Sequence, residues 1–228
     1  MIGIIGAMDI EVESIKALLT DKKEEKISGV NFVSGKIADK DVVVAKCGVG
    51  KVFAALCAEA MILKFAPDMI INVGVAGCLD SSLKIGSIVI ADSVVQHDMD
   101  ISALGHPLGL LDGLDIVKIP ADKEIYTALE KSVSELGLSY TVGTIASGDQ
   151  FVADSGKKKF IIDNFDAKSC EMEGGAIGHV CYVNGVPFGI LRAMSDGADD
   201  GASMDFPTFT RMAAENSTNV IKSFFTKL

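Results

Sequence analysis

The sequence predicts a single α/β domain in which a central, twisted, mixed β-sheet is flanked by helices. Short apolar runs alternate with segments of helical periodicity along the chain, which is typical of a largely parallel sheet covered by helices. The 228 residues suffice for one domain with a substantial core, and no linker or low-complexity tract divides residues 1–228. Two neighbouring strands in the first third, Asn31–Ile37 and Asp41–Lys46, indicate that the sheet is mixed.

The first half of the chain supplies most of the expected strands. Asp9 is a suitable N-cap for the first helix, and Pro67 marks the end of the second. We expect strands at Ile2–Gly6, Asn31–Ile37, Asp41–Lys46, Met69–Val75 and Ser87–Val95, and helices at Asp9–Leu19 and Lys51–Phe65.

Helical patterns dominate the second half. Gly137 stops the first of these helices, because glycine readily adopts the conformation that ends a helix. We expect helices at Lys123–Leu136, Gly156–Asn164, Gly174–Asn184 and Thr208–Phe225, and strands at Tyr140–Ala146 and Phe188–Met194.

Charge and composition exclude several classes of partner. The formal net charge of −10 repels nucleic-acid phosphates and anionic membrane surfaces, so we expect neither as a partner. No apolar run is long enough to span a membrane, and the N-terminus lacks the features of a signal peptide. The five cysteines form no C-x-x-C motif and are expected to be core residues of a cytoplasmic protein. His97-Asp98-x-Asp100 is too weak a pattern to predict a metal, and no cofactor is expected.

A polar cluster follows the strand Phe188–Met194. The sequence Arg192-Ala-Met-Ser195-Asp196 brings charged groups to the strand's carboxyl end, where open α/β sheets bind their ligands. Asp196 is therefore the first candidate for a working acid.

Glu11 is a second candidate because it lies on the apolar face of its helix. At 100° per residue it shares a sector with Ile15 and Leu18, where a carboxylate needs partners or a role. The alternative is an ordinary acidic residue in the first turn, which the helix dipole favours.

Glu171 and Glu173 flank Met172 just before an apolar, and therefore buried, helix, which favours a functional role over a solvated charge pair. Arg192 lies within a buried strand, where a guanidinium needs a carboxylate partner. Asp196, Glu171 and Glu173 are the candidate partners, and a purely structural ion pair remains the alternative.

Three further segments place small or aromatic residues between expected elements. Gly48–Lys51 lacks the spacing of a P-loop and is better interpreted as a tight turn than as a phosphate cradle. Asn72–Cys78 is either a turn that needs glycine or a site of close ligand approach. Phe151 either stacks on a flat heterocycle or belongs to an ordinary junction after its strand.

Seven motifs occur together and in one order. They are G-I-I-G-A-M with a Glu three positions on, G-V-G-K, G-V-A-G, H-D-x-D, S-G-D-x-F, E-M-E and R-A-M-S-D. With these, the chain resembles the bacterial 5′-methylthioadenosine/S-adenosylhomocysteine nucleosidases of the nucleoside phosphorylase superfamily, over essentially its whole length.

The resemblance implies a homodimeric hydrolase with one nucleosidase domain, residues 1–228, and no cofactor. Water would displace adenine from C1′ of the ribose through a transition state resembling an oxocarbenium ion. The implied substrates are 5′-methylthioadenosine, S-adenosylhomocysteine and 5′-deoxyadenosine, in methionine salvage and in recycling the by-products of S-adenosylmethionine.

The resemblance also assigns the catalytic roles. Asp196 matches the general acid that protonates N7 of adenine, with Ser195 and Arg192 to orient it. Glu11 matches the residue that positions and polarises the water. Glu173 matches the residue that holds the ribose hydroxyls and favours a cationic sugar.

The remaining implied contacts surround the substrate. Met172 would pack beneath the ribose, Phe151 would stack on adenine, and the backbone of Val152 would read its edge. Further substrate contacts implied by the resemblance are Val49, Ala76 and Gly77, with Met8 and Phe206 at the 5′-thio group and Ile101, Leu104 and His106 from the second subunit.

Two departures and three alternatives accompany this assignment. Val75 stands where the family commonly has a Ser or Thr that helps to hold the water, and Gly174 and Gly175 replace bulkier small residues. The alternatives are a phosphorylase, a hydrolase of larger 5′-substituted nucleosides such as those of menaquinone biosynthesis, and a non-catalytic nucleoside-binding protein. No arginine precedes Arg192, which favours water over phosphate as the nucleophile.

Overall fold

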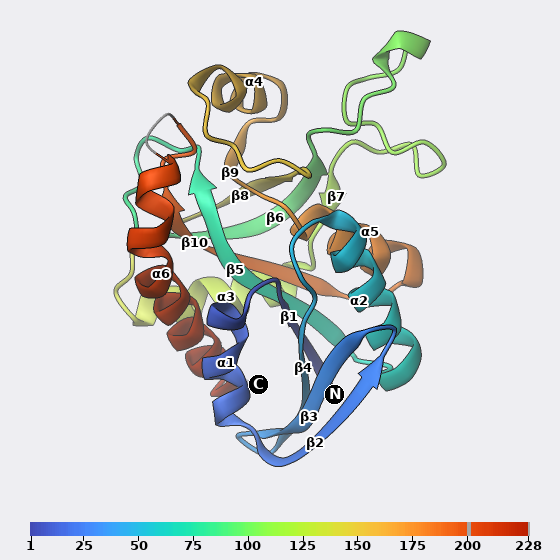
Figure 1. Cartoon of the computed structure of the whole chain (residues 1–228), viewed down its shortest axis with the longest axis vertical. Helices are drawn as coiled ribbons and strands as arrows, with labels where there is room; N and C mark the ends of the chain where they lie inside the picture. The colour runs from blue at the N-terminus through green and yellow to red at the C-terminus, as the bar shows by residue number, and fades with distance from the viewer. Residues whose placement is uncertain (200–201, 228) are drawn as a thin grey trace.

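The computed structural model of the protein describes residues 1–199 and 202–227, without the side chain of residue 204. One ten-stranded mixed β-sheet carries helices against both faces, as expected from the sequence (Figure 1). The strands are β1 (Ile2–Gly6), β2 (Thr20–Ile27), β3 (Val30–Ile37), β4 (Lys40–Lys46), β5 (Met69–Cys78), β6 (Ile88–Gln96), β7 (Ile119–Pro120), β8 (Tyr140–Ser147), β9 (Ala167–Glu171) and β10 (Phe188–Asp196).

Most of the helices form two groups on opposite sides of the sheet, while α4 contacts β8 and β9. Helices α1 and α3 pack against α6, whereas α2 packs against α5 on the other side (Figure 1). Their bounds are α1 (Asp9–Leu18), α2 (Lys51–Phe65), α3 (Lys123–Glu135), α4 (Ser155–Phe165), α5 (Gly174–Asn184) and α6 (Ala202–Phe225), with a 3-10 turn, η1 (Ser102–Leu104).

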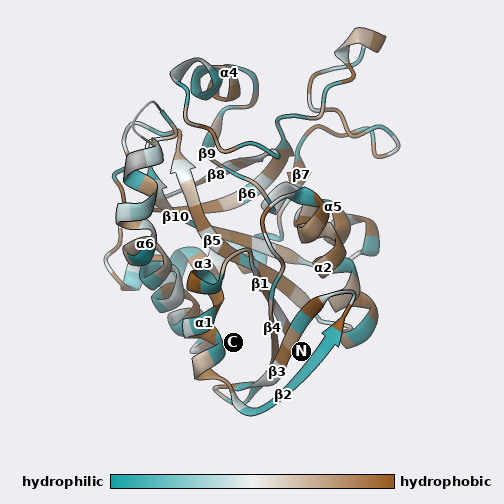
Figure 2. Ribbon diagram, in the orientation of Figure 1, coloured by the Kyte–Doolittle hydropathy of each residue, from teal (hydrophilic) through white to brown (hydrophobic). Residues whose placement is uncertain are grey.

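Alternation along the strands divides the core between these two faces. Ile5 and Ile70 pack with the α2 and α5 side, whereas Ile4 and Ile71 pack with the side of α1, α3 and α6. Figure 2 shows the apolar colouring of the inner strands and the polar colouring of β2. Within the part of the chain described, no helix combines the length and apolar character needed to cross a membrane.

Strand pairing brings the expected site segments together. Strand β10 runs parallel to β5 and antiparallel to β6, while β9 joins β5 to β8, so these five strands close on themselves. Asp196 is paired with Gly77, Gly77 with Cys170, and Ser147 with Glu171. The ends of β5, β8, β9 and β10 therefore meet on one side of the sheet.

The structure adds strands that the sequence does not predict. In β2, residues 20–26 are exposed and Ile27 is partly buried, so this edge strand shows no apolar alternation. Strand β9 has only five residues and two neighbours, and β7 has only two residues.

Helix α6 begins at Ala202 rather than at the expected Thr208. It contains Pro207 in its second turn, although proline lacks the N–H that a helix interior uses. The expected helix starts just after Pro207, so it lacks the first turns of α6.

The segment between β6 and β7, residues 97–118, extends away from the body of the molecule (Figure 1). We call this segment the arm. Turn η1 lies near its tip, and residues 102–107 are exposed.

Candidate active site

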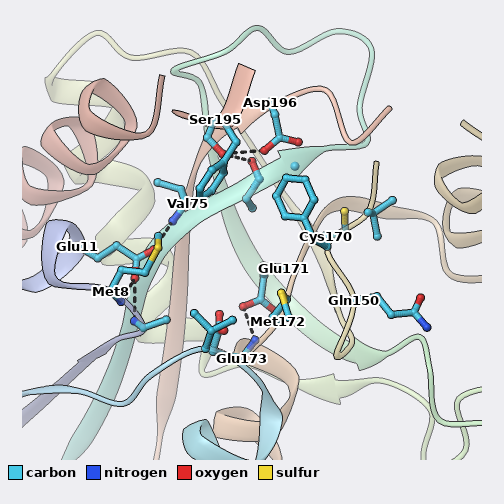
Figure 3. A pocket seen from close by; sticks show the side chains of 17 residues that line it. Met8, Glu11, Val75, Gln150, Cys170, Glu171, Met172, Glu173, Ser195 and Asp196 are labelled. Atoms are coloured by element: carbon cyan, nitrogen blue, oxygen red, sulfur yellow. Dashed lines mark hydrogen bonds between the residues drawn. The ribbon is translucent and has the colours of Figure 1, made fainter. Parts of the chain in front are cut away.

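A pocket with a cavity volume of about 130 Å³ lies where the four strand ends meet (Figure 3). Residues of α1 and α6 and the turn before α2 complete its wall. Its lining residues are Ala7, Met8, Glu11, Val49, Val75, Ala76, Gly77, Gln150, Phe151, Val152, Cys170, Glu171, Met172, Glu173, Ser195, Asp196 and Phe206.

Asp196 is the last residue of β10 and is only 2% exposed. Its Oδ2 accepts a hydrogen bond from the Ser195 hydroxyl (2.9 Å), and its Oδ1 accepts one from the Ala198 N–H (2.9 Å). Burial outweighs these two bonds and raises the pKa of Asp196 above its usual value. The carboxyl group is thus held in place and is more readily protonated than an exposed aspartate.

Glu11 reaches the pocket from the first turn of α1. Its Oε2 accepts hydrogen bonds from the N–H groups of Ala7 (2.7 Å) and Met8 (2.9 Å), and its Oε1 accepts one from Val75 (3.0 Å). Burial raises the pKa of Glu11, against the opposing charge of Arg192 and these three bonds. The contact with Val75 uses its backbone, so the valine side chain leaves this anchor of Glu11 intact.

Arg192 pairs with Glu171 rather than with Asp196. The guanidinium is 1% exposed and donates to Glu171, Asn72 and the Leu191 carbonyl oxygen, so Arg192 makes no direct contact that would orient Asp196. This differs from the role that the resemblance implies.

Glu171 receives further hydrogen bonds besides the ion pair with Arg192. Its carboxylate accepts from the Ser147 hydroxyl and from the N–H groups of Glu173 (3.0 Å) and Gly174 (2.7 Å). Burial alone would raise the pKa of Glu171, but Arg192 and these donors hold it below its usual value. Glu171 is therefore a fixed negative charge beside the pocket.

Glu173 is buried close to that fixed charge and has fewer donors. Its Oε1 accepts one hydrogen bond, from the N–H of Gly50 (2.9 Å). Burial, followed by the negative charge of Glu171, raises the pKa of Glu173 to about 7. The group therefore exchanges a proton near neutral pH and can accept hydrogen bonds from a ligand.

Aromatic and thioether side chains form the apolar part of the pocket. The rings of Phe151 and Phe206 meet edge to face with their centroids 5.5 Å apart. Met8 lies beside Glu11, and Met172 lies beside Glu171 (Figure 3). The arrangement suits a ligand with a flat heterocycle, a hydroxylated centre and an apolar tail.

The pocket contains most of the expected site residues but not all of them. Arg192 lies behind the lining, and Ile101, Leu104 and His106 lie on the arm, outside the pocket of their own chain. Five lining residues were not expected as substrate contacts: Ala7, Val75, Gln150, Cys170 and Glu171. Ala7, Val75, Gln150 and Glu171 lie within recognised motifs, and Cys170 directly precedes one, so membership of a motif or proximity to one was the signal that could have found them.

Among the residues that the structure describes, no group of three or more His, Cys, Asp or Glu side chains is placed to hold a metal ion. The ring of His97, at the start of the arm, is buried, and neither of its ring nitrogens has a hydrogen-bond partner.

Comparison with known proteins gives consistent matches over the whole chain. Residues 1–226 match the phosphorylase superfamily. The 5′-methylthioadenosine/S-adenosylhomocysteine nucleosidase of Shewanella loihica is 38% identical, with 100% of this chain and 99% of that protein covered. A mutant nucleosidase of this name from Helicobacter pylori, with 5′-methylthioadenosine in its active site, superposes with a TM-score of 0.96 at 37% identity, covering 100% and 98% of the two chains.

A second solved structure carries a different name. The futalosine hydrolase of Helicobacter pylori superposes with a TM-score of 0.95 at 36% identity, covering 100% of this chain and 97% of that one. The matched fold, the full-length identity and the shared motifs agree. The chain therefore belongs to the phosphorylase superfamily and, within it, to the 5′-methylthioadenosine/S-adenosylhomocysteine nucleosidases.

Proposed function

We propose that this chain is a hydrolase that cleaves the N-glycosidic bond of 5′-methylthioadenosine and S-adenosylhomocysteine to release adenine. Its relatives bear these substrates in their names, and a similar structure holds 5′-methylthioadenosine in its active site. The observation that carries the proposal for this chain is the convergence of Glu11, Glu173 and Asp196 on one pocket.

Asp196 serves as the general acid. Adenine is a poor leaving group as an anion, so a proton must reach N7 as the glycosidic bond breaks. The buried position of Asp196 favours its protonated form, and the Ser195 hydroxyl and Ala198 N–H fix its two oxygens. Ser195 is thus the orienting residue, and Arg192 acts on other groups.

Glu11 serves as the residue that positions and polarises the attacking water. Three backbone N–H groups hold its carboxylate in one position. In the bound complex this position is next to C1′ of the ribose, where the water attacks. Val75 offers no hydroxyl to share this task, which leaves the water to Glu11.

Glu173 binds the ribose hydroxyls, and its negative charge stabilises the cationic sugar of the transition state. Met172 packs beneath the ribose, and Phe151 stacks on adenine, with the backbone of Val152 at the base edge. The apolar pair Met8 and Phe206 receives the 5′-thio group. The position of all five in one pocket supports these roles.

Arginine use favours hydrolysis over phosphorolysis. The guanidinium of Arg192 is occupied by Glu171 and Asn72, and Arg211 is exposed on α6. Neither lines the pocket, so no guanidinium fork is available there for phosphate.

The test is an incubation of the protein with 5′-methylthioadenosine, with and without phosphate, followed by identification of the sugar product. We expect free methylthioribose in both cases. Formation of methylthioribose 1-phosphate only when phosphate is present would replace the hydrolase with a phosphorylase. Absence of adenine release from any 5′-substituted adenosine would indicate a binding protein.

The range of 5′ substituents is a finer proposal. Met8 and Phe206 are apolar, so the end of the pocket that they line does not require a polar group on the 5′ substituent. We therefore expect 5′-deoxyadenosine to be a substrate as well. The structural likeness to a futalosine hydrolase supports a larger 5′-substituted nucleoside as a second candidate. Ranking kcat/KM across these nucleosides decides between them, and the thioadenosines would place the enzyme in methionine salvage.

The homodimer and the cytoplasmic location are proposals as well. Helix α2 leaves Val52 77% exposed and Phe53 58% exposed, and Leu104 on the arm is 76% exposed. A second copy that covers this face would bring its arm, with Ile101, Leu104 and His106, to the open side of the pocket. The five cysteines are buried free thiols, which supports a reducing compartment.

A further inference from the structure

A ring of hydrogen bonds joins three distant segments just outside the pocket. The ammonium group of Lys51 donates to Asp98 Oδ1 (2.7 Å), and Asp98 Oδ2 accepts from the N–H of Asp149 (2.9 Å). Asp149 Oδ1 in turn accepts from the N–H of Lys51 (2.8 Å), which closes the ring. We call Lys51, Asp98 and Asp149 the latch.

The latch is shielded from solvent more than an ordinary surface ion pair. The side chains of Lys51 and Asp98 are 19% and 17% exposed. Burial would raise the pKa of Asp98, but Lys51 and the Asp149 N–H hold it below its usual value. The lowered pKa favours the charged form of Asp98, and a charged acceptor makes the stronger hydrogen bonds.

One end of the latch lies next to the hydrogen bond that holds Glu173. The N–H of Gly50 donates to Glu173, and the following N–H, of Lys51, donates to Asp149. Gly50 has a φ of +101°, and a Cβ there would lie 3.0 Å from Asp149 Oδ1. Two consecutive N–H groups at the start of α2 are thus directed at two different carboxylates.

Helix α2 depends on this external carboxylate because its own sequence provides no cap. Its first turn contains no acidic residue, and Gly50 has no side chain with which to cap it. Asp149 accepts the hydrogen bond from the N–H of Lys51 that a capping side chain would otherwise accept. Asp149 also directly precedes the loop Gln150–Val152, which lines the pocket. The latch therefore joins the turn that binds Glu173 to the loop that carries Phe151.

We propose that Lys51, Asp98 and Asp149 are positioning residues that hold the Gly50 N–H on Glu173 and so set how the enzyme binds the ribose hydroxyls. None of the three lines the pocket, so they act through Gly50 and the loop. The proposal rests on the proposed function, since it assigns the ribose to Glu173. Opening the ring frees the turn at Gly50 and weakens the hydrogen bond from the Gly50 N–H to the Glu173 carboxylate.

The test is Lys51→Met, which removes the charge and keeps much of the side-chain length. The probes are 5′-methylthioadenosine and its 3′-deoxy analogue, which lacks one hydroxyl that Glu173 would bind. We expect the ratio of the two kcat/KM values to fall by about tenfold, because the selectivity for the hydroxyl is lost. Lys51→Arg should restore most of this selectivity, since it keeps a charged donor.

Lys64→Met is the matched control. Lys64 lies on the same helix and pairs with Glu25 at 2.6 Å, far along the chain from the latch and outside the pocket lining. We expect its selectivity and activity to match the wild type. Circular dichroism and Tm identify any variant that has merely lost its fold. If Lys51→Met is such a variant, Asp98→Asn is used instead, because it weakens the same ion pair from the other side.

A double-mutant comparison separates positioning from general weakening. In a Glu173→Gln background, Lys51→Met should have little further effect on selectivity, because both changes act on one contact. An unchanged ratio in folded Lys51→Met, or equal losses on both probes, overturns the latch while leaving the hydrolase intact. A wild-type protein that releases no adenine overturns both proposals.

Discussion

Four buried carboxylates lie within one pocket, and their surroundings separate their chemistry. Glu171 stays ionised because Arg192 and several donors face it, whereas burial raises the pKa of Asp196 and Glu11. Glu173, with one donor and a negative neighbour, has a pKa of about 7. The surroundings therefore favour a proton on Asp196 and a negative charge on Glu171, which separates the acid and the charged group that glycosidic cleavage uses.

Replacing Asp196 with Asn should abolish turnover and keep the fold. An amide cannot deliver the proton, so we expect kcat to fall by about 10²–10⁴-fold. Asn Oδ1 can still accept from the Ala198 N–H, and the Ser195 hydroxyl can rotate to accept from the amide. Steady-state kinetics with circular dichroism provide the check, and near-normal activity would remove Asp196 from its role as general acid.

Glu11→Gln should stop hydrolysis and leave ligand binding largely in place. Three N–H groups donate to the carboxylate, and the new NH₂ group cannot accept from any of them. Only the amide oxygen remains as an acceptor, so a stability loss of about 1–3 kcal/mol is also expected. Glu13→Gln is the control, because Glu13 is exposed and pairs with Lys16. Calorimetric binding together with activity tests the prediction, which a fully active Glu11→Gln enzyme would contradict.

Glu173 should make the protein less stable as pH rises from about 4.5 to about 7. The unfolded chain loses this proton near the ordinary glutamate pKa of 4.5, whereas the folded chain keeps it up to about 7. Between these values the folded state binds more protons, so its unfolding free energy falls by roughly 3 kcal/mol and then levels off.

Denaturant titrations at pH 5 and pH 8 measure this effect. Glu173→Gln should flatten the difference between the two pH values, whereas the exposed Glu124→Gln should leave it unchanged. If the stability of Glu173→Gln still differs between pH 5 and pH 8 as in the wild type, other groups cause the pH dependence.

The sequence predicts the residues of the site but does not reveal which of them pair with one another. The motifs predict Glu11, Glu173 and Asp196 together, and the structure places all three in the pocket. Three carboxylates were candidates for Arg192, and only the packing of β9 beside the pocket selects Glu171. Such a choice depends on contacts between remote segments, which hydrophobic periodicity does not encode.

At the scale of elements, the buried strands and amphipathic helices are predictable, and the exposed or short strands are not. Strand β3 pairs with β4 through a turn at Ala38 and Asp39, both with positive φ, as expected for a tight hairpin. Charged β2 has no buried face to produce an apolar alternation, and β9 is too short to show one. These strands exist because their neighbours offer hydrogen-bonding edges.

Gly74 of strand β5 has no side chain, and this leaves room for the Glu11 carboxylate, which we assign to the attacking water. A Cβ at this position would lie 2.7 Å from Glu11 Oε1 and 3.3 Å from the Arg192 guanidinium. Gly74→Ala should displace the Glu11 carboxylate and lower kcat by at least about tenfold, with a stability loss of about 1–3 kcal/mol.

Gly143→Ala on strand β8 is the control. A Cβ there would meet the Lys168 side chain, which is 29% exposed and can shift. We expect this variant to keep wild-type kcat. Equal kcat in Gly74→Ala and wild type would mean that Glu11 does not depend on close approach to β5.

At the scale of the whole molecule, the arm is the feature that a single chain does not explain. The arm extends away from the body of the molecule (Figure 1). Leu104 on the arm is 76% exposed, and Phe151 at the pocket is 49% exposed. A two-fold dimer that exchanges arms would cover both, because a two-fold axis places each arm at the other copy. Light scattering should then give the mass of two chains.

Mixing two inactive variants tests whether the arms are exchanged. Leu104→Asp damages the arm and keeps its own pocket chemistry, whereas Asp196→Asn keeps the arm and loses the acid. In a mixed dimer, the intact arm of the Asp196→Asn chain reaches the intact acid of the Leu104→Asp chain, so one site of two works. Co-expressed and purified as a heterodimer, the pair should recover about half of the wild-type activity. The control Leu136→Asp, at an exposed position after α3, should be active without mixing. A heterodimer no more active than its two parents would show that each pocket is closed by its own chain.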